Sequence, residues 1–84
     1  MYDYYFTFRS VTTAMKGSRI LERAGIKTLL SRTPKMLQQQ GCGYSLKVRA
    51  ENLQAAQTVL LLEDVRFNKI YRREENGRWQ EVLR

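Results

Sequence analysis

Alternating side chains dominate the start of the chain, where residues 2–8 read Tyr-Asp-Tyr-Tyr-Phe-Thr-Phe. Successive side chains of a strand point to opposite faces, so this segment predicts a strand with one aromatic face. The residues on that face are Tyr2, Tyr4, Phe6 and Phe8. Such a face either stacks the bases of a nucleic acid or packs beneath helices, and the second arrangement is far commoner. We therefore expect a sheet whose first strand is covered by helices.

The remaining apolar patterns predict two helices and three further strands. Ser10 is a suitable N-cap, and Gly25 a suitable C-terminal stop, for a helix over residues 11–24. Period-two alternation returns in residues 44–48, and helical periodicity in residues 51–62. The other expected strands are residues 26–30 and 65–72. This order is that of an α+β, ferredoxin-like βαββαβ two-layer sandwich, in which two helices pack on one face of an antiparallel sheet with the first and third strands at its centre.

Helical spacing divides each expected helix into a buried and an exposed side. The buried residues are expected to be Val11, Ala14, Met15, Leu21 and Ala24 in the first helix, and Leu53, Ala56, Val59 and Leu60, widened by Ala55, Leu61 and Leu62, in the second. The exposed side of the first helix is a basic ridge, which we define as Lys16, Arg19 and Arg23. A ridge of this kind is either a solvated face or a docking surface for an acidic partner.

The C-terminal segment carries a strong hairpin signal, Asn76-Gly77. It predicts a fifth strand over residues 78–83, in which Trp79 anchors the hairpin on the domain or on a partner. Docking on the same domain is the commoner arrangement. We expect a single domain over residues 1–84, with a core at about 1–71 and a C-terminal hairpin extension at about 72–84.

Composition narrows the classes of function. Fifteen Lys and Arg against eight Asp and Glu give a net charge of +7, which favours anionic partners. Without histidine and with one cysteine, the chain cannot form a Ser-His or Cys-His pair or an internal disulfide. We expect no metal or other cofactor, and we do not expect an ordinary enzyme. No apolar run approaches the roughly 20 residues that span a bilayer, and no signal-peptide pattern begins the chain, so we expect a cytoplasmic protein without a membrane partner.

The candidate for chemistry is Cys42, which stands between Gly41 and Gly43. Small neighbours leave a thiol approachable, whereas a lone cysteine is about as often buried and inert. A thiolate is the reactive form, and nearby positive charge lowers the pKa of a thiol from its reference of about 8.5. Arg32 and Lys35 are the best candidates for that charge. The expected fold brings Cys42 to the end of the sheet near Arg32.

Beyond these patterns, the chain resembles the putative Se/S carrier protein-like family over about residues 3–71. The residues that carry the resemblance are Thr7-Phe8, Ala14, Ala24-Gly25-Ile26, Thr33-Pro34, Cys42-Gly43 and Glu51-Asn52-Leu53. The resemblance implies a ferredoxin-like domain whose cysteine carries persulfide sulfur or selenium between donor and acceptor proteins. The chain departs from the family in Gln39-Gln40-Gly41, where small residues such as serine are common, and in residues 72–84, which pass the usual end.

One cysteine cannot release a cargo through an internal disulfide, so a partner thiol or a reductant has to accept it. The basic ridge and the C-terminal hairpin are the expected docking surfaces. Two alternatives stay open. One is a basic nucleic-acid-binding module that stacks bases on the open sheet face, although residues 44–49 lack the aromatic-rich signature of the common RNA-recognition motif. The other is a regulatory or assembly module that forms a homodimer and has an incidental cysteine.

Overall fold

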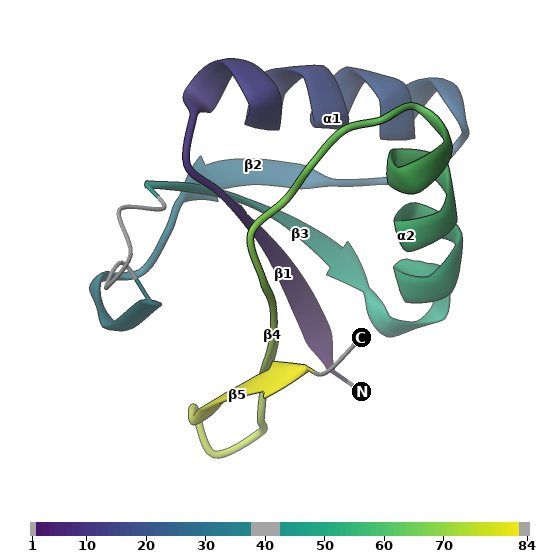
Figure 1. Ribbon diagram of the computed structural model, residues 1–84. Coiled ribbons are helices and arrows are strands. Elements are labelled where there is room, and N and C mark those ends of the chain that lie inside the picture. The colour runs from purple at the N-terminus through teal and green to yellow at the C-terminus, as the bar shows by residue number, and fades with distance from the viewer. Residues whose placement is uncertain (1, 38–42, 83–84) are drawn as a thin grey trace.

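A computed structural model describes residues 2–37 and 43–82 of the chain. The described residues form five strands and two helices: β1 (Asp3–Phe8), α1 (Val11–Arg23), β2 (Leu29–Arg32), β3 (Tyr44–Arg49), α2 (Leu53–Leu62), β4 (Ile70–Arg73) and β5 (Trp79–Val82) (Figure 1). Two short 3₁₀ helices, η1 (Lys35–Leu37) and η2 (Ala50–Asn52), precede β3 and α2. The α+β class is therefore confirmed.

The strands form one antiparallel sheet in the order β2-β3-β1-β4-β5. β1 lies at the centre, hydrogen-bonded to β3 on one side and to β4 on the other, so the predicted pairing of the first and third strands is confirmed. The register places Phe6 opposite both Leu46 and Ile70. Residues that are opposite each other share a face, so these three apolar side chains meet on one side of the sheet.

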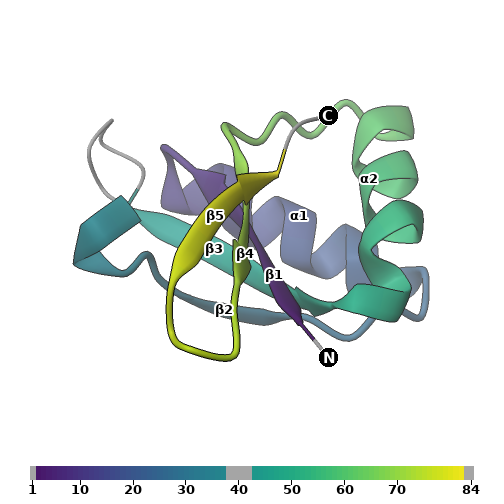
Figure 2. The same cartoon turned by 90° about the horizontal axis from the view of Figure 1, so that it is seen from below.

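Both helices pack on that side. Phe6 and Phe8 are buried in the same hydrophobic cluster as Leu21 of α1 and Leu60 of α2. Phe6 and Phe8 of the predicted aromatic face are therefore core, as predicted, and Tyr4 packs against them, whereas Tyr2 is partly exposed outside the core. Seen from below, the strands lie in front of α1, so neither helix covers the opposite face of the sheet (Figure 2).

The buried side of α1 differs from the prediction. Val11 and Met15 are 39% and 46% exposed, and the buried residues are Ala14, Gly17 and Leu21. Gly17 explains the difference, because a Cβ at this position would lie 3.3 Å from Leu46 Cδ1. The missing side chain lets α1 approach the sheet along this line and turns Val11 and Met15 outward. The predicted exposure of the basic ridge is confirmed.

Part of the predicted apolar side of α2 is also exposed. The helix begins at Leu53, after η2, and buries Ala56 and Leu60. Ala55 is exposed, and Leu61 and Leu62 are 79% and 76% exposed, so these residues do not widen the core.

Two predicted strands begin later than expected, at Leu29 instead of residue 26 and at Ile70 instead of residue 65. The cause is a Schellman motif at the end of each helix. Ile26 N–H donates to Leu21 O at 2.9 Å, and Val65 N–H donates to Leu60 O at the same distance. Both apolar residues are buried against the helix they follow, so they belong to helix ends rather than to strands.

The predicted C-terminal hairpin is confirmed, with β5 paired to β4. Gly77 has a φ of +84° at the turn, and Glu74 N–H donates to Arg78 O at 2.8 Å. The rings of Trp79 and Tyr5 meet edge to face, with their centroids 4.8 Å apart. Trp79 therefore anchors β5 on this chain, as expected. No helix among the described residues is long and apolar enough to cross a membrane.

Candidate functional site

The connection between β2 and β3 is closed by a hydrogen bond at its base. Arg32 and Tyr44 are opposite each other in the sheet, and Thr33 N–H donates to Gly43 O at 3.0 Å. These contacts hold the two ends of the connection together. Because Phe8 is also opposite Tyr44, the connection leaves the sheet at the end where β1 passes into α1 (Figure 1).

Cys42 and Gly41 lie outside the described residues, so their proposed role stays a prediction. Gly43 is partly buried, and a Cβ built on it would meet no atom of the described part of the chain within 4 Å. Neither crowding nor a left-handed backbone requires glycine at this position.

Arg32 is the last residue of β2, and Lys35 lies on the connection that follows it. The Cζ atom of Arg32 is 5.6 Å from the centroid of the Tyr44 ring, within the range of a cation–π contact. That contact keeps the guanidinium beside the first residue of β3. Lys35 is exposed at the start of η1. No ion pair within residues 2–37 and 43–82 includes Arg32 or Lys35, so neither positive charge is neutralised there.

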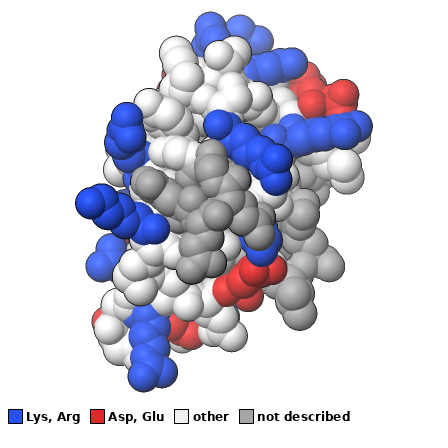
Figure 3. All heavy atoms as spheres, turned by 60° about the vertical axis from the view of Figure 1, so that its left-hand side comes forward, with Lys and Arg blue, Asp and Glu red and all other residues white. Residues whose placement is uncertain are grey.

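The basic ridge does not join these two cations in one cluster. α1 begins at the end of the sheet that holds the connection and runs to the opposite end, where Arg23 is its last residue (Figure 1). A helix rises about 1.5 Å per residue, so Arg23 lies roughly 18 Å along the axis from the start of α1. Figure 3 shows the side of the molecule nearest the connection, where Lys and Arg side chains are widely distributed and Asp and Glu occupy smaller areas.

Buried hydroxyl groups near this end of the sheet were not anticipated. Thr7, Ser45 and Ser31 are opposite one another across three strands, and Thr7 and Ser45 are almost fully buried. Thr7 Oγ1 accepts from Lys69 N–H at 3.2 Å, whereas Ser45 Oγ has no hydrogen-bond partner within residues 2–37 and 43–82. The sequence offered a weak signal, since all three are small polar residues at strand positions that face away from the core.

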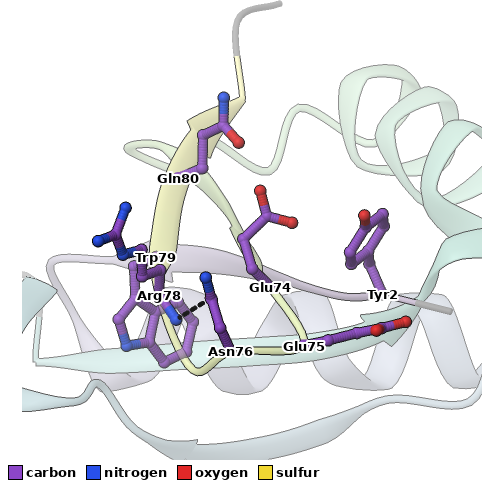
Figure 4. A pocket seen from close by; sticks show the side chains of 7 residues that line it. All are labelled: Tyr2, Glu74, Glu75, Asn76, Arg78, Trp79 and Gln80. Carbon is purple, nitrogen blue, oxygen red and sulfur yellow. Dashed lines mark hydrogen bonds between the residues drawn. The ribbon is translucent and has the colours of Figure 1, made fainter.

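A hollow that was also not anticipated lies beside the C-terminal hairpin (Figure 4). Glu74 lies across it from Tyr2, and Asn76 Oδ1 accepts from Arg78 N–H at 3.0 Å within the turn. Arg72 connects two residues that line the hollow, because its Nη2 donates to Glu74 Oε1 at 3.0 Å and to Gln80 Oε1 at 2.6 Å.

The Arg72 guanidinium also lies over the Tyr2 ring, with Cζ 4.7 Å from the centroid. The hydrogen bond to Glu74 raises the pKa of Arg72 above its ordinary value, so the group stays charged. Since these polar groups bind one another, we interpret the hollow as part of the hairpin's structure. No group of three or more His, Cys, Asp or Glu that could hold a metal ion occurs among the described residues.

Comparison with known families gives one match. The family model described as putative Se/S carrier protein-like covers residues 3–72, from β1 to the third residue of β4, including the segment that contains Cys42. Searches of curated proteins and of solved structures found no match.

Proposed function

The chain belongs to the putative Se/S carrier protein-like family, and from this membership we propose that it carries persulfide sulfur or selenium on Cys42 and passes it to a partner protein. The observation that carries the proposal is the family match, which spans most of the chain and includes its single thiol. In this role the protein is a carrier and not an enzyme. A sulfur or selenium donor and an acceptor protein are its partners.

The transfer is an exchange at sulfur that needs no external oxidant. The Cys42 thiolate attacks the outer sulfur of a donor persulfide, the donor's S–S bond breaks, and its electron pair leaves with the donor thiolate. Cys42 then holds a persulfide. In the second step an acceptor thiolate attacks the outer sulfur of that persulfide, and Cys42 is released as a thiolate. The chain has no second cysteine for an internal disulfide, so the acceptor has to supply the attacking group.

The positive charges on the connection support the first step. A cation near a thiol favours the thiolate and so lowers the pKa of the thiol. Arg32 is held on Tyr44, two residues after Cys42, and Lys35 stands on the other arm of the same connection. We assign to Arg32 and Lys35 the role of stabilising the Cys42 thiolate or of binding an anionic partner next to it.

The basic ridge is proposed as the docking surface for an acidic donor or acceptor. Lys16, Arg19 and Arg23 are exposed on α1, whose first turn stands at the end of the sheet that holds the connection. A partner protein that binds along α1 therefore extends to the connection between β2 and β3. The charges of the basic ridge attract the partner protein, and the sulfur transfer takes place at Cys42.

We also infer the architecture that the family match implies. The order β2-β3-β1-β4, with a helix after β1 and another after β3, supports a ferredoxin-like plan to which β5 is added at an edge. The match ends at residue 72, which supports a core at about residues 1–71 followed by a hairpin extension within one domain.

The test is intact-mass spectrometry of the wild type and of Cys42→Ser after incubation with a cysteine desulfurase and cysteine. The wild type should gain the mass of one sulfur atom, removable by a thiol reductant, and Cys42→Ser should gain none. Arg32→Gln should load more slowly near neutral pH and recover at higher pH, where the thiol ionises without help. A wild-type protein that takes up no sulfur and also resists alkylation while folded would overturn the proposal.

A further inference from the structure

The open face of the sheet, turned away from both helices, carries three aromatic side chains. Tyr5 of β1 is opposite Tyr71 of β4, and Trp79 of β5 is opposite Arg73, the second residue after Tyr71. Positions two apart on a strand share a face, so all three rings are on this side. Tyr5, Tyr71 and Trp79 are each partly exposed. We call these three residues the aromatic platform.

The rings of the platform are held in place by the sheet and by one another. Tyr5 and Trp79 pack edge to face at a centroid distance of 4.8 Å, with 73° between their planes. Arg73 lies over the indole, with Cζ 5.4 Å from the ring centroid. A rigid aromatic surface next to a guanidinium is suited to flat, anionic ligands, because the rings stack on the flat part and the cation meets the charge.

Further cations lie across β1 from the indole. Lys47 is opposite Tyr5, and Arg49 is opposite Asp3. Both basic residues also line a shallow hollow at the edge of the sheet, together with Lys27 and Leu29. No ion pair among the residues that the structure describes includes Lys27, Lys47 or Arg49.

Acidic groups on this face are few. Asp3 lies between Arg49 and Arg73 in the register, and the other acid, Glu81, is paired with Lys69 at 3.2 Å. The face therefore combines stacking surfaces with a surplus of positive charge, in keeping with the net charge of +7 of the whole chain.

We propose that this face binds single-stranded nucleic acid, with bases stacked on the aromatic platform and phosphates held by Lys47, Arg49 and Lys27. Unpaired bases are required, since a duplex hides the flat surfaces that the rings would meet. The 5.4 Å contact of Arg73 with the indole adds a positive charge to the platform itself. The signature of the common RNA-recognition motif is not involved, because Tyr71 and Trp79 come from β4 and β5.

Arg49 of the proposed surface stands at the end of β3 away from the connection. Asp3 and Arg49 stand at one end of the β1–β3 pair, and Phe8 and Tyr44 stand at the other end, next to the connection. Strands rise about 3.4 Å per residue, so the two ends are roughly 17 Å apart. Nucleic-acid binding should therefore not depend on Cys42, and the two functions can be tested independently.

The test is fluorescence anisotropy with labelled single strands of DNA and RNA of one sequence, and with the matching duplex, each titrated with the full chain. Both single strands should bind more tightly than the duplex, and a difference between DNA and RNA would identify the preferred sugar. Trp79 is the only tryptophan, so stacking should also quench its fluorescence.

Three variants separate stacking from charge. Trp79→Ala should weaken single-strand binding about 5- to 150-fold, and Trp79→Phe should restore most of it. Lys47→Gln should reduce the slope of log K against log salt by about 0.7, which is the effect of one lost phosphate contact on a single strand. Arg9→Gln is the matched control, because Arg9 is exposed and follows the opposite end of β1. It should retain at least half of the wild-type affinity.

Three results would overturn the proposal. The first is equal affinity for duplex and single strand with no effect of Trp79→Ala, which means binding by net charge alone. The second is an equal loss in Arg9→Gln and Lys47→Gln. The third is no binding, with a dimer that Trp79→Ala dissociates, which makes the face a contact between copies of the chain. Cys42→Ser should bind normally, so failure of the sulfur-carrier proposal would leave this result unchanged.

Discussion

Close packing of α1 against the rest of the core depends on Gly17, which makes this glycine the most informative position for a stability test. A Cβ there would lie 3.3 Å from Leu46 Cδ1, 3.4 Å from Leu60 Cδ2 and 3.4 Å from Val65 Cγ1. These neighbours are 0%, 0% and 4% exposed and belong to β3, to α2 and to the segment after α2. One added carbon therefore reaches contact distance on three sides.

The expected cost follows from that geometry. Overpacking a filled core costs typically 1–3 kcal/mol, and Gly17→Leu should be at the top of this range, about 3 kcal/mol, because the carbons beyond Cβ have no space. Replacing glycine by leucine inside a helix recovers about 0.8 kcal/mol of helix propensity. The net loss is about 2 kcal/mol, which for a domain of this size lowers the Tm by roughly 8–16 °C. Gly17→Ala should stay within about 1 kcal/mol of the wild type, since the methyl ends that it meets can retreat while the helix gains propensity.

Urea and thermal unfolding followed by far-ultraviolet circular dichroism measure both values. Glu22→Leu is the matched control, because it adds leucine to an exposed position of the same helix and should change the free energy of unfolding by less than about 0.5 kcal/mol. Gly17→Leu with a stability equal to that of Glu22→Leu would refute the close approach of α1 to the core.

Three further predictions concern the helix ends and the buried hydroxyls, and the same unfolding measurements check them. Asp64 has a φ of +56° at the end of α2, so Asp64→Gly should stabilise the protein by about 1 kcal/mol. Gly25 has a φ of +81° at the end of α1, so Gly25→Ala should destabilise the protein by a similar amount. Effects of the same sign in both variants would contradict a left-handed backbone at the two helix ends. Thr7→Val removes the acceptor of Lys69 N–H and should cost about 1–3 kcal/mol; no loss would show that this bond is dispensable. Ser45→Ala removes a buried hydroxyl without a partner and should be neutral or stabilising by up to about 1 kcal/mol; a loss as large as that of Thr7→Val would mean that the hydroxyl is bonded.

The candidate site was predictable only in part. Arg32 ends β2 and Lys35 follows it on the connection, because residues three positions apart in the chain stay close in space. The aromatic platform was not predictable, since Tyr5 and Trp79 are 74 positions apart in the chain and meet only through the pairing of β1, β4 and β5. The contact of two such distant side chains depends on register and packing, which no local pattern encodes.

The sequence by itself determined the class of fold, the order of the elements, the cap at Ser10 and the turn at Gly77, because each follows from local periodicity or from the conformational preferences of single residues. Only the tertiary structure decided where β2 and β4 begin and which side of α1 is buried. In the sequence, an apolar residue after a helix can either start a strand or close a Schellman motif at the helix end. In the folded protein, Ile26 and Val65 close Schellman motifs. Likewise, the space that Leu46 and Leu60 leave at Gly17 sets the rotation of α1, and that space exists only once the sheet and both helices have come together.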